Sequence, residues 1–371
     1  MSLTGTSFFV VTILLAVLTV VALVLVWNRI PGPAPAKITA RVGLIVFSQF
    51  AAVLMVLVFV NNRMGPFYDT WGSLFGQDAS VQMTATGGDS TGGNGSGGTS
   101  GASDVSAQRL SFSKYNNDVL SASAVGPESR IKADIYVWLP PQYNEPAYAH
   151  TDFPVLELLP GTPGTPKAWF GSMHADSTMK TLMSEGKVKP MILVSAKLNM
   201  FGGSRDSGCA NLPGSYQTAT WLAKDVPTLI KQNFRVSGTP KSWGIAGYSA
   251  GGYCAANLTV KYPQVFHAGV TMSGYNAPDS AVVLRDPALT AANNPLLLLQ
   301  KAKKQPDIVL MAQGVTTDGT TVADAKALIK ALPKPGTSQV LTLSSGGHDT
   351  RTFVREMTPM LTWMSKQITG H

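Results

Sequence analysis

The chain begins with two long apolar runs and then changes to short apolar stretches that alternate with amphipathic ones. Residues 7–27 form an unbroken apolar stretch of about 21 residues, and residues 42–60 form a second of about 19. Each is long enough to cross the roughly 30 Å hydrocarbon core of a bilayer as a helix. The pattern therefore predicts two transmembrane helices, which form a hairpin over residues 1–63.

The charges that flank the apolar runs predict the orientation of this hairpin. Arg29, Lys37 and Arg41 lie between the runs, whereas residues 1–6 carry no charge. Because basic residues are retained on the cytoplasmic side, both termini and everything after residue 60 are expected outside the cytoplasm. A cleaved signal peptide is the alternative for the first run. Against it, the apolar core is long, no basic residue precedes it, and no small-residue cleavage site is evident.

A segment with almost no apolar residues separates the hairpin from the rest of the chain. Residues 79–108 are rich in Gly, Ser and Thr and are predicted to form a flexible linker, joined to the hairpin by a juxtamembrane segment at residues 64–78. A random coil of about 30 residues spans roughly 30 Å. The linker is therefore expected to hold the following domain, residues 109–371, near a membrane surface.

From residue 109 onward the pattern predicts an α/β domain. Strands are predicted at residues 119–125, 131–139, 154–159, 190–196, 241–248, 267–273, 308–313 and 339–344, and helices at 218–234, 253–262, 293–303, 322–332 and 352–368. The first two strands are expected to form an antiparallel pair. Strands separated by helices of this length predict a mostly parallel sheet with helices on both faces.

Composition and charge narrow the classes of partner. Residues 1–107 hold four basic and four acidic residues, so the whole net charge of +8 belongs to the remainder of the chain. A basic domain outside the cytoplasm suits anionic lipid headgroups or wall polymers, and a solvated basic face without a partner is the alternative. The sequence shows no nucleic-acid-binding module, metal-ligand cluster or cofactor fingerprint. We therefore expect no nucleic acid, metal or cofactor, and the oligomeric state is not predicted.

Two cysteines, Cys209 and Cys254, both fall in the domain predicted to lie outside the cytoplasm. An oxidising compartment permits them to pair. A disulfide would close a loop of about 45 residues and contribute roughly 4 kcal/mol in the chain-entropy model. Two buried free thiols are the alternative. Neither cysteine has the CxxC spacing of a redox or metal site.

The sequence Gly-Tyr-Ser-Ala-Gly-Gly at residues 247–252 has the form of a nucleophile elbow. The short GxSxG motif is a weak signal by itself. Here it follows a predicted strand and precedes a predicted helix, which is the structural context expected of a nucleophile elbow. A serine at the apex of such a turn is strained, and flanking glycines relieve the crowding. Ser249 is thus the candidate nucleophile. Its place after the fifth predicted strand matches the order of elements in the α/β-hydrolase fold.

A serine nucleophile needs a base and a group that orients the base, and on this fold the acid and then the histidine follow the serine. Of the five histidines, His348 fits best, because it lies in a glycine-rich turn between the last predicted strand and helix. The candidate acid is Asp318, since it follows the strand that ends near residue 313. Asp324 is the alternative acid, although it also suits the first turn of a helix.

The developing oxyanion needs two backbone N–H donors. Ala250, the residue after the nucleophile, is expected to provide one. The second is expected from the loop after the third predicted strand, where Pro160 and Pro163 have no N–H group. Thr162 is favoured over Gly161 as that donor. A tight turn without a role in catalysis is the alternative for this loop.

Several blocks of the sequence together carry a family resemblance. They are Leu-Leu-Pro-Gly at 158–161, Gly-Tyr-Ser-Ala-Gly-Gly-Tyr at 247–253, Tyr-Pro at 262–263 with Phe266, Ser-Gly-Tyr at 273–275, and Gly-Gly-His-Asp at 346–349. In order and spacing, most of residues 130–368 resembles the putative-esterase group of α/β-hydrolases, which includes enterochelin-esterase-like enzymes and secreted mycolyltransferases. The resemblance implies Ser249 as nucleophile, His348 as base, and backbone donors at Thr162 and Ala250. Unlike the mycolyltransferases, the chain has no Glu between Ser249 and His348.

We therefore expect a membrane-tethered serine esterase or acyltransferase that works outside the cytoplasm through an acyl-enzyme. Its substrate is expected to be an acyl ester, either a small molecule or a lipid or envelope component. One alternative is a non-catalytic module that keeps the hydrolase scaffold to bind envelope material. A serine peptidase of the same fold is another.

Overall fold

The computed structural model describes residues 6–64, 82–83, 109–116, 118–201, 206–332 and 336–370. The chain divides into two compact units, Met1–Asp78 and Ala79–His371. Apart from residues 82–83, the predicted linker at 79–108 lies outside the described residues, and so does nearly all of the predicted juxtamembrane segment. Each unit is described by itself below.

The first unit is a hairpin of two long helices, α1 (Thr6–Val26) and α2 (Ala34–Met64). Both are long and apolar enough to cross a membrane, and α2 extends beyond the predicted span 42–60 at both ends. The side chains buried within the hairpin are mostly small: Thr12, Thr19, Ser48, Ala51 and Val58. Many large apolar side chains point outward instead. At the turn, the Arg41 guanidinium donates two hydrogen bonds to the Trp27 carbonyl and lies 4.8 Å from the centre of its ring.

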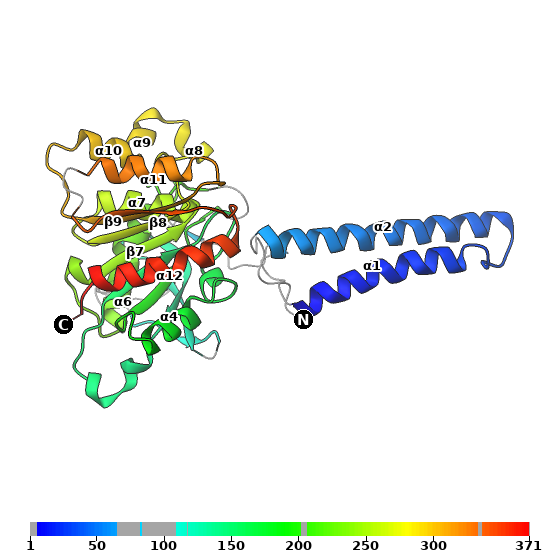
Figure 1. Ribbon diagram of the computed structural model, residues 1–371, viewed down its shortest axis with the longest axis horizontal. Helices are drawn as coiled ribbons and strands as arrows, with labels where there is room; N and C mark the ends of the chain where they lie inside the picture. The colour runs from blue at the N-terminus through cyan, green and yellow to red at the C-terminus, as the bar shows by residue number, and fades with distance from the viewer. Residues whose placement is uncertain are drawn as a thin grey trace, which may run out of the picture. The chain divides into compact units, whose positions relative to one another are not determined.

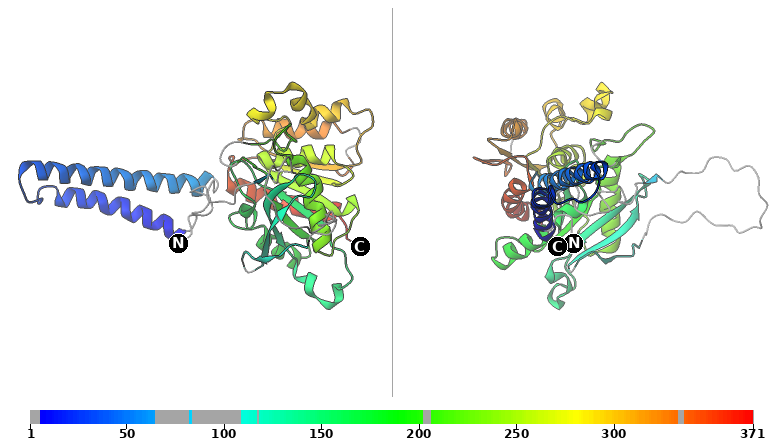
Figure 2. Two further views of the ribbon diagram at one scale, coloured as in Figure 1. Left: turned by 180° about the vertical axis from the view of Figure 1, so that it is seen from behind. Right: turned by 90° about the vertical axis from the view of Figure 1, so that its right-hand side faces the viewer.

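The second unit is built on a single sheet (Figures 1 and 2). Its strands are β1 (Gln82–Met83), β2 (Ser113–Lys114), β3 (Val119–Val125), β4 (Ile131–Trp138), β5 (Val155–Leu159), β6 (Ile192–Ala196), β7 (Trp243–Tyr248), β8 (Ala268–Met272), β9 (Val309–Val315) and β10 (Gln339–Leu343). They lie in the order β10-β9-β8-β7-β5-β6-β4-β3-β2, with β1 paired to β4. The run from β10 to β6 is parallel, whereas β4, β3, β2 and β1 pair antiparallel.

Helices connect the parallel strands, and one more helix follows the last strand. They are α4 (Ala175–Ser184), α5 (Thr218–Thr220), α6 (Val226–Asn233), α7 (Ala250–Lys261), α8 (Ala281–Leu284), α9 (Pro287–Ala292), α10 (Pro295–Lys301), α11 (Thr321–Lys330) and α12 (Thr350–Gln367). A π-helical turn, Trp221–Asp225, joins α5 to α6 and makes one continuous helical segment. Short 3₁₀ turns occur at Pro141–Asn144, Pro146–Tyr148, Pro166–Trp169 and Pro240–Ser242.

The core is split by the sheet. On one face, α6 and α7 bury residues such as Leu229 and Leu258 against the strands, and α11 covers the β9 end of this face. On the other face, α12 and α4 bury Met360 and Met179. All five residues of β5, β6 and β8 are buried, as expected for parallel strands covered on both sides. The prediction of a mostly parallel sheet with helices on both faces, preceded by two apolar helices, is confirmed.

Several elements differ from the sequence prediction. α4, α8 and α9 were not predicted, because they are short and two of them lie in the irregular stretch before β9. Strand β1 falls inside the segment predicted as linker, and its two residues pair with Ile131 and Lys132 of β4. Such pairing depends on a partner strand and leaves no local signal in a polar, glycine-rich segment.

Candidate active site

Ser249 occupies the turn between β7 and α7. Its backbone lies in a strained region, with φ 55° and ψ −125°, and its N–H donates to the Met272 carbonyl at 3.0 Å. A Cβ at Gly247 would lie 2.3 Å from the Gly251 carbonyl carbon, and a Cβ at Gly251 would lie 2.3 Å from the Leu159 oxygen. Only glycine fits both positions, so the close approach of β7, α7 and β5 fixes where the Ser249 side chain emerges.

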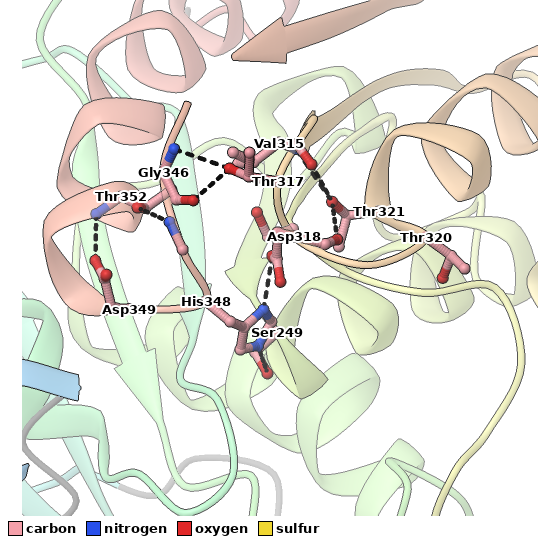
Figure 3. Close-up of polar contacts among 12 residues, drawn as sticks. Ser249, Val315, Thr317, Asp318, Thr320, Thr321, Gly346, His348, Asp349 and Thr352 are labelled. Atoms are coloured by element: carbon pink, nitrogen blue, oxygen red, sulfur yellow. Dashed lines mark hydrogen bonds and ion pairs between the residues drawn. The ribbon is translucent and has the colours of Figure 1, made fainter. Parts of the chain in front are cut away.

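The structure brings Ser249, His348 and Asp318 together (Figure 3). His348 Nε2 lies 2.8 Å from Ser249 Oγ, and His348 Nδ1 lies 2.8 Å from Asp318 Oδ2. The Asp318 side chain is 13% exposed and that of His348 is 44% exposed. In this chain of contacts the imidazole can take the serine proton, while the carboxylate fixes its tautomer and stabilises the imidazolium.

Two loops deliver the histidine and the aspartate, and they are tied to each other. Asp318 follows β9, and His348 lies between β10 and α12. The Thr317 hydroxyl donates to the Gly346 carbonyl and accepts from the Gly346 N–H, at 2.5 and 3.2 Å (Figure 3). Asp349 caps α12 by accepting from the Thr352 N–H at 2.9 Å. Thr317 could not be predicted from the sequence, because its role depends on the parallel pairing of β9 with β10.

The alternative acid, Asp324, has other partners. It lies in the first turn of α11, where its carboxylate accepts from the Thr320 hydroxyl at 2.7 Å and from the Asn276 side-chain amide at 3.2 Å. The Nδ1 atom of His348 is bonded to Asp318 instead. The geometry therefore favours Asp318 and gives Asp324 a structural role at the start of a helix.

The two predicted oxyanion donors, Thr162 and Ala250, line the same pocket as Ser249. Ala250 is the first residue of α7, so its N–H has no acceptor within the helix. Thr162 follows Gly161, where a Cβ would lie 2.9 Å from the Tyr248 ring and 3.2 Å from Ser249 Cβ. The backbone of the Thr162 loop thus passes directly beside the nucleophile.

A pocket of about 530 Å³ opens at Ser249. Its wall is mixed, with the apolar side chains of Phe201, Tyr275 and Val282 and the charged side chains of Asp206, Asp279 and Arg285. These residues come from the loop after β6 and from the segment between β8 and α9. Tyr275 belongs to the Ser-Gly-Tyr block at 273–275 that carries part of the family resemblance, but its place in the pocket wall was not predicted. Sequence reasoning missed the others as pocket residues, because they lie in irregular segments without a periodic pattern.

Aromatic rings support the histidine. The Phe353 ring meets that of His348 edge-on, with centroids 5.2 Å apart, and stacks on Tyr248 at 4.8 Å. Trp169 contacts Tyr248 from another side at 5.3 Å. Such packing restricts the imidazole to orientations that keep its two hydrogen bonds.

A second carboxyl group is buried near Asp318. Glu356 on α12 is fully buried, and its Oε1 accepts from the Ser273 hydroxyl at 3.0 Å, while its Oε2 has no hydrogen-bond partner among the described atoms. Burial raises the pKa of Glu356 to about 8, the Ser273 bond opposes the rise, and the nearby charge of Asp318 adds to it. Glu356 is therefore mostly protonated at neutral pH.

The two cysteines are joined. Cys209, in the loop after β6, forms a disulfide with Cys254 on α7, with Cα atoms 5.8 Å apart. The bond connects a loop of the pocket wall to the helix that begins next to Ser249. Within the described ranges, no group of three or more His, Cys, Asp or Glu side chains is arranged to hold a metal ion.

Comparison with known proteins identifies the family. A family model described as "Putative esterase" matches residues 127–364. The chain belongs to this esterase family. The chain is 33% identical over 147 residues to an uncharacterized protein of Corynebacterium glutamicum. That match covers 39% of this chain and 33% of the relative, so the chain spans about a third of the relative's length.

Solved structures with low sequence identity share the fold of this chain. A ferulic acid esterase has a TM-score of 0.58 at 22% identity, over 67% of this chain and 98% of its own. An S-formylglutathione hydrolase from Agrobacterium tumefaciens has a TM-score of 0.56 at 15% identity, over 70% and 99%. A fluorophosphonate-binding serine hydrolase from Staphylococcus aureus has a TM-score of 0.55 at 16% identity, over 67% and 98%. The likeness shows the α/β-hydrolase fold.

Proposed function

We propose that this protein cleaves an acyl ester through a covalent intermediate on Ser249, with His348 as general base and Asp318 as the residue that orients it. The observation that carries the proposal is the pair of 2.8 Å contacts from His348, one to Ser249 Oγ and one to Asp318 Oδ2. This spacing lies within the hydrogen-bond reach required for proton transfer.

The reaction follows from these positions. As Ser249 Oγ bonds to the acyl carbon, its proton moves to His348 Nε2, and the N–H groups of Thr162 and Ala250 stabilise the oxyanion. When the tetrahedral intermediate collapses, the alcohol leaves with the proton from His348, and the acyl group stays on Ser249 as an ester. His348 then takes a proton from a water molecule as that water attacks the acyl carbon. When the bond between the acyl carbon and Ser249 Oγ breaks, His348 returns the proton to Ser249 Oγ and the acid is released.

Hydrolysis is the outcome that we propose, with acyl transfer to a bound alcohol as the competing outcome. The His348 side chain is 44% exposed, so water has access to the acyl-enzyme. The partition can be measured by supplying a p-nitrophenyl acyl ester with increasing glycerol. Free acid as the main product at all glycerol concentrations supports hydrolysis, whereas a glycerol ester that dominates at low glycerol identifies a transferase.

A matched pair of variants tests the assignment of the acid. Asp318→Asn is expected to lower kcat by about 10⁴-fold, because the amide favours the wrong imidazole tautomer. Asp324→Asn is the matched control, because it makes the same substitution on the helix that follows Asp318. It is expected to change kcat by less than about threefold, because the partners of Asp324 are Thr320 and Asn276. An equal loss in the two variants would contradict the assignment.

We also propose that α1 and α2 cross the membrane and place the catalytic unit outside the cytoplasm. The apolar length of both helices supports spanning, and the basic residues Arg29, Lys37 and Arg41 support a cytoplasmic turn. Single cysteines introduced at Ser2 and at Pro33 can be probed in intact cells with a membrane-impermeant maleimide. Labelling at position 2 alone is expected, and labelling at position 33 alone would reverse the topology.

The substrate is proposed to be an ester at or near the outer membrane surface, either a small molecule or a lipid or envelope component. The support is the predicted tether together with the excess of basic residues after residue 107. Comparing short with long acyl p-nitrophenyl esters, in detergent and in anionic vesicles, distinguishes the two kinds of substrate.

A further inference from the structure

Asp206 contacts three of the segments that form the pocket. Its Oδ2 accepts a hydrogen bond from the Thr162 hydroxyl at 3.2 Å, and its Oδ1 accepts from the Gly208 N–H at 2.8 Å. Its backbone carbonyl accepts from the Ser280 hydroxyl at 2.6 Å, just before α8. One residue thus links the loop after β5, the loop after β6 and the start of α8.

Asp206 is itself firmly held. Gly208 has a φ of 59°, and a Cβ there would lie 2.9 Å from Val283, so this turn requires glycine. The next residue, Cys209, is bonded to Cys254 of α7. The Asp206 carboxylate is therefore anchored to the same helix that supplies the Ala250 donor, and it gives the Thr162 hydroxyl a fixed partner.

The position of Thr162 needs such a partner. Its neighbours are Gly161, which has no side chain, and Pro163, which has no N–H group, so the Thr162 hydroxyl provides a side-chain hydrogen bond that neither neighbour can make. Threonine is branched at Cβ and stiff at χ1, so a hydrogen bond to its hydroxyl also restricts the backbone that carries its N–H. A donor that is held in place before the reaction stabilises an oxyanion better than one that must reorient.

The surroundings of Asp206 shift its pKa in opposite directions. Burial raises the pKa of Asp206, and Asp279 adds to the rise, whereas the hydrogen bonds from Gly208 and Thr162 lower it. The same two bonds that hold the loop therefore oppose the rise.

We propose that Asp206 is a positioning residue for the oxyanion hole, which acts through the Thr162 hydroxyl and sets the direction of the Thr162 N–H. Asp206 does not touch the reacting atoms in this proposal. The inference rests on the proposed catalytic function, because it assigns Asp206 a role only if Ser249 forms an acyl-enzyme.

The first test compares substitutions at Thr162 in the full-length protein, with hydrolysis of a p-nitrophenyl ester as the readout. Thr162→Val keeps the shape and the N–H but removes the hydroxyl. We expect kcat to fall about 10-fold to 100-fold with KM within about twofold, since loss of a whole oxyanion donor costs about 10²–10³ in kcat. Thr162→Ser keeps the hydroxyl and is expected to stay within about threefold of wild type. Equal kcat values in the two variants would overturn the proposal.

The second test is a double-mutant cycle. Asp206→Ala is expected to lower kcat as Thr162→Val does, and the double variant is expected to be no worse than either single variant, since both remove the same hydrogen bond. Asp206→Asn keeps an acceptor and adds a donor for the Thr162 hydroxyl, so it is expected to restore most of kcat. Effects that multiply in the double variant, or a rise in KM alone, would overturn the proposal.

Controls separate this inference from the proposed function and from folding. Asp118→Ala removes an exposed carboxylate that pairs with Lys180 and is expected to leave kcat unchanged. If Ser249→Ala keeps full activity, the proposed function fails. If Ser249→Ala is inactive but the Thr162 pair shows no difference, only the positioning role of Asp206 fails. Comparison of Thr162→Val with Thr162→Ser still tests whether the Thr162 hydroxyl is needed, even if Asp206→Ala does not fold.

Discussion

Glu356→Gln is expected to remove a large part of the pH dependence of stability. Glu356 is fully buried, and its pKa is raised to about 8 from the ordinary value of 4.5. Between these values the unfolded chain releases a proton that the folded protein keeps, so the free energy of unfolding falls as pH rises. For one such group the fall is about 1.4 kcal/mol per pH unit, and it ends above the folded pKa.

Glutamine has nearly the same shape as the protonated carboxyl group and can accept from Ser273 in the same way, but it does not ionise. The variant should therefore match wild type within about 1 kcal/mol at pH 4.5, where Glu356 is protonated in the folded protein and about half ionised in the unfolded chain. It should become more stable than wild type by about 3–5 kcal/mol at pH 8. The gain comes from removing the cost of keeping a buried group protonated.

The assay is guanidinium unfolding of the full-length protein in detergent, followed by tryptophan fluorescence at pH 4.5, 6 and 8. Glu185→Gln is the matched control, because Glu185 is an exposed carboxylate that pairs with Lys187, and its substitution should leave the pH slope unchanged. A Glu356→Gln variant with the wild-type slope between pH 4.5 and 8 would refute the reasoning, since it would mean that Glu356 ionises normally in the folded protein.

Two further predictions concern other buried groups. Glu157 on β5 is fully buried with both carboxylate oxygens unpaired among the described atoms, and burial raises its pKa well above the ordinary value. Glu157→Met should therefore stabilise the protein by about 1–3 kcal/mol at pH 8 in the same unfolding assay. A loss of stability would show that the carboxyl group has a partner in the folded state. Replacing both Cys209 and Cys254 by Ala removes the disulfide across a sequence separation of 45 and should lower the free energy of unfolding by about 4 kcal/mol, measured with guanidinium. An unchanged free energy of unfolding relative to oxidised wild type would mean that the bond does not constrain the unfolded chain.

The elements that could be predicted from the sequence are those with a strong local signal. The apolar run 7–27 closely matches α1, and the glycines around Ser249 point to the elbow, because crowding there excludes side chains. The sequence could only rank Asp318 above Asp324 as the candidate acid, because both lie shortly after the same strand. It depends on how the loop after β9 meets the loop before α12, which is a tertiary contact made through Thr317.

Other parts of the site had no signal at all. Asp206 lies in an irregular loop, and its partner Thr162 is 44 residues away in sequence. In the sequence, Glu356 has the pattern of an ordinary polar residue on a helix. Only the packing of α12 on the sheet shows that its side chain is buried. Polar residues that act through burial or long-range hydrogen bonds leave little trace in periodicity or motif.

The most direct test of the central claim is labelling of the full-length protein with a fluorophosphonate probe, followed by mass spectrometry to locate the adduct. The probe reacts with a serine that is activated by a base, so the wild-type protein should carry one adduct on Ser249. The Ser249→Ala variant, with an unchanged melting temperature, should carry none. Absence of labelling in folded wild-type protein, or equal labelling of the Ser249→Ala variant, would contradict the assignment of Ser249 as the catalytic nucleophile.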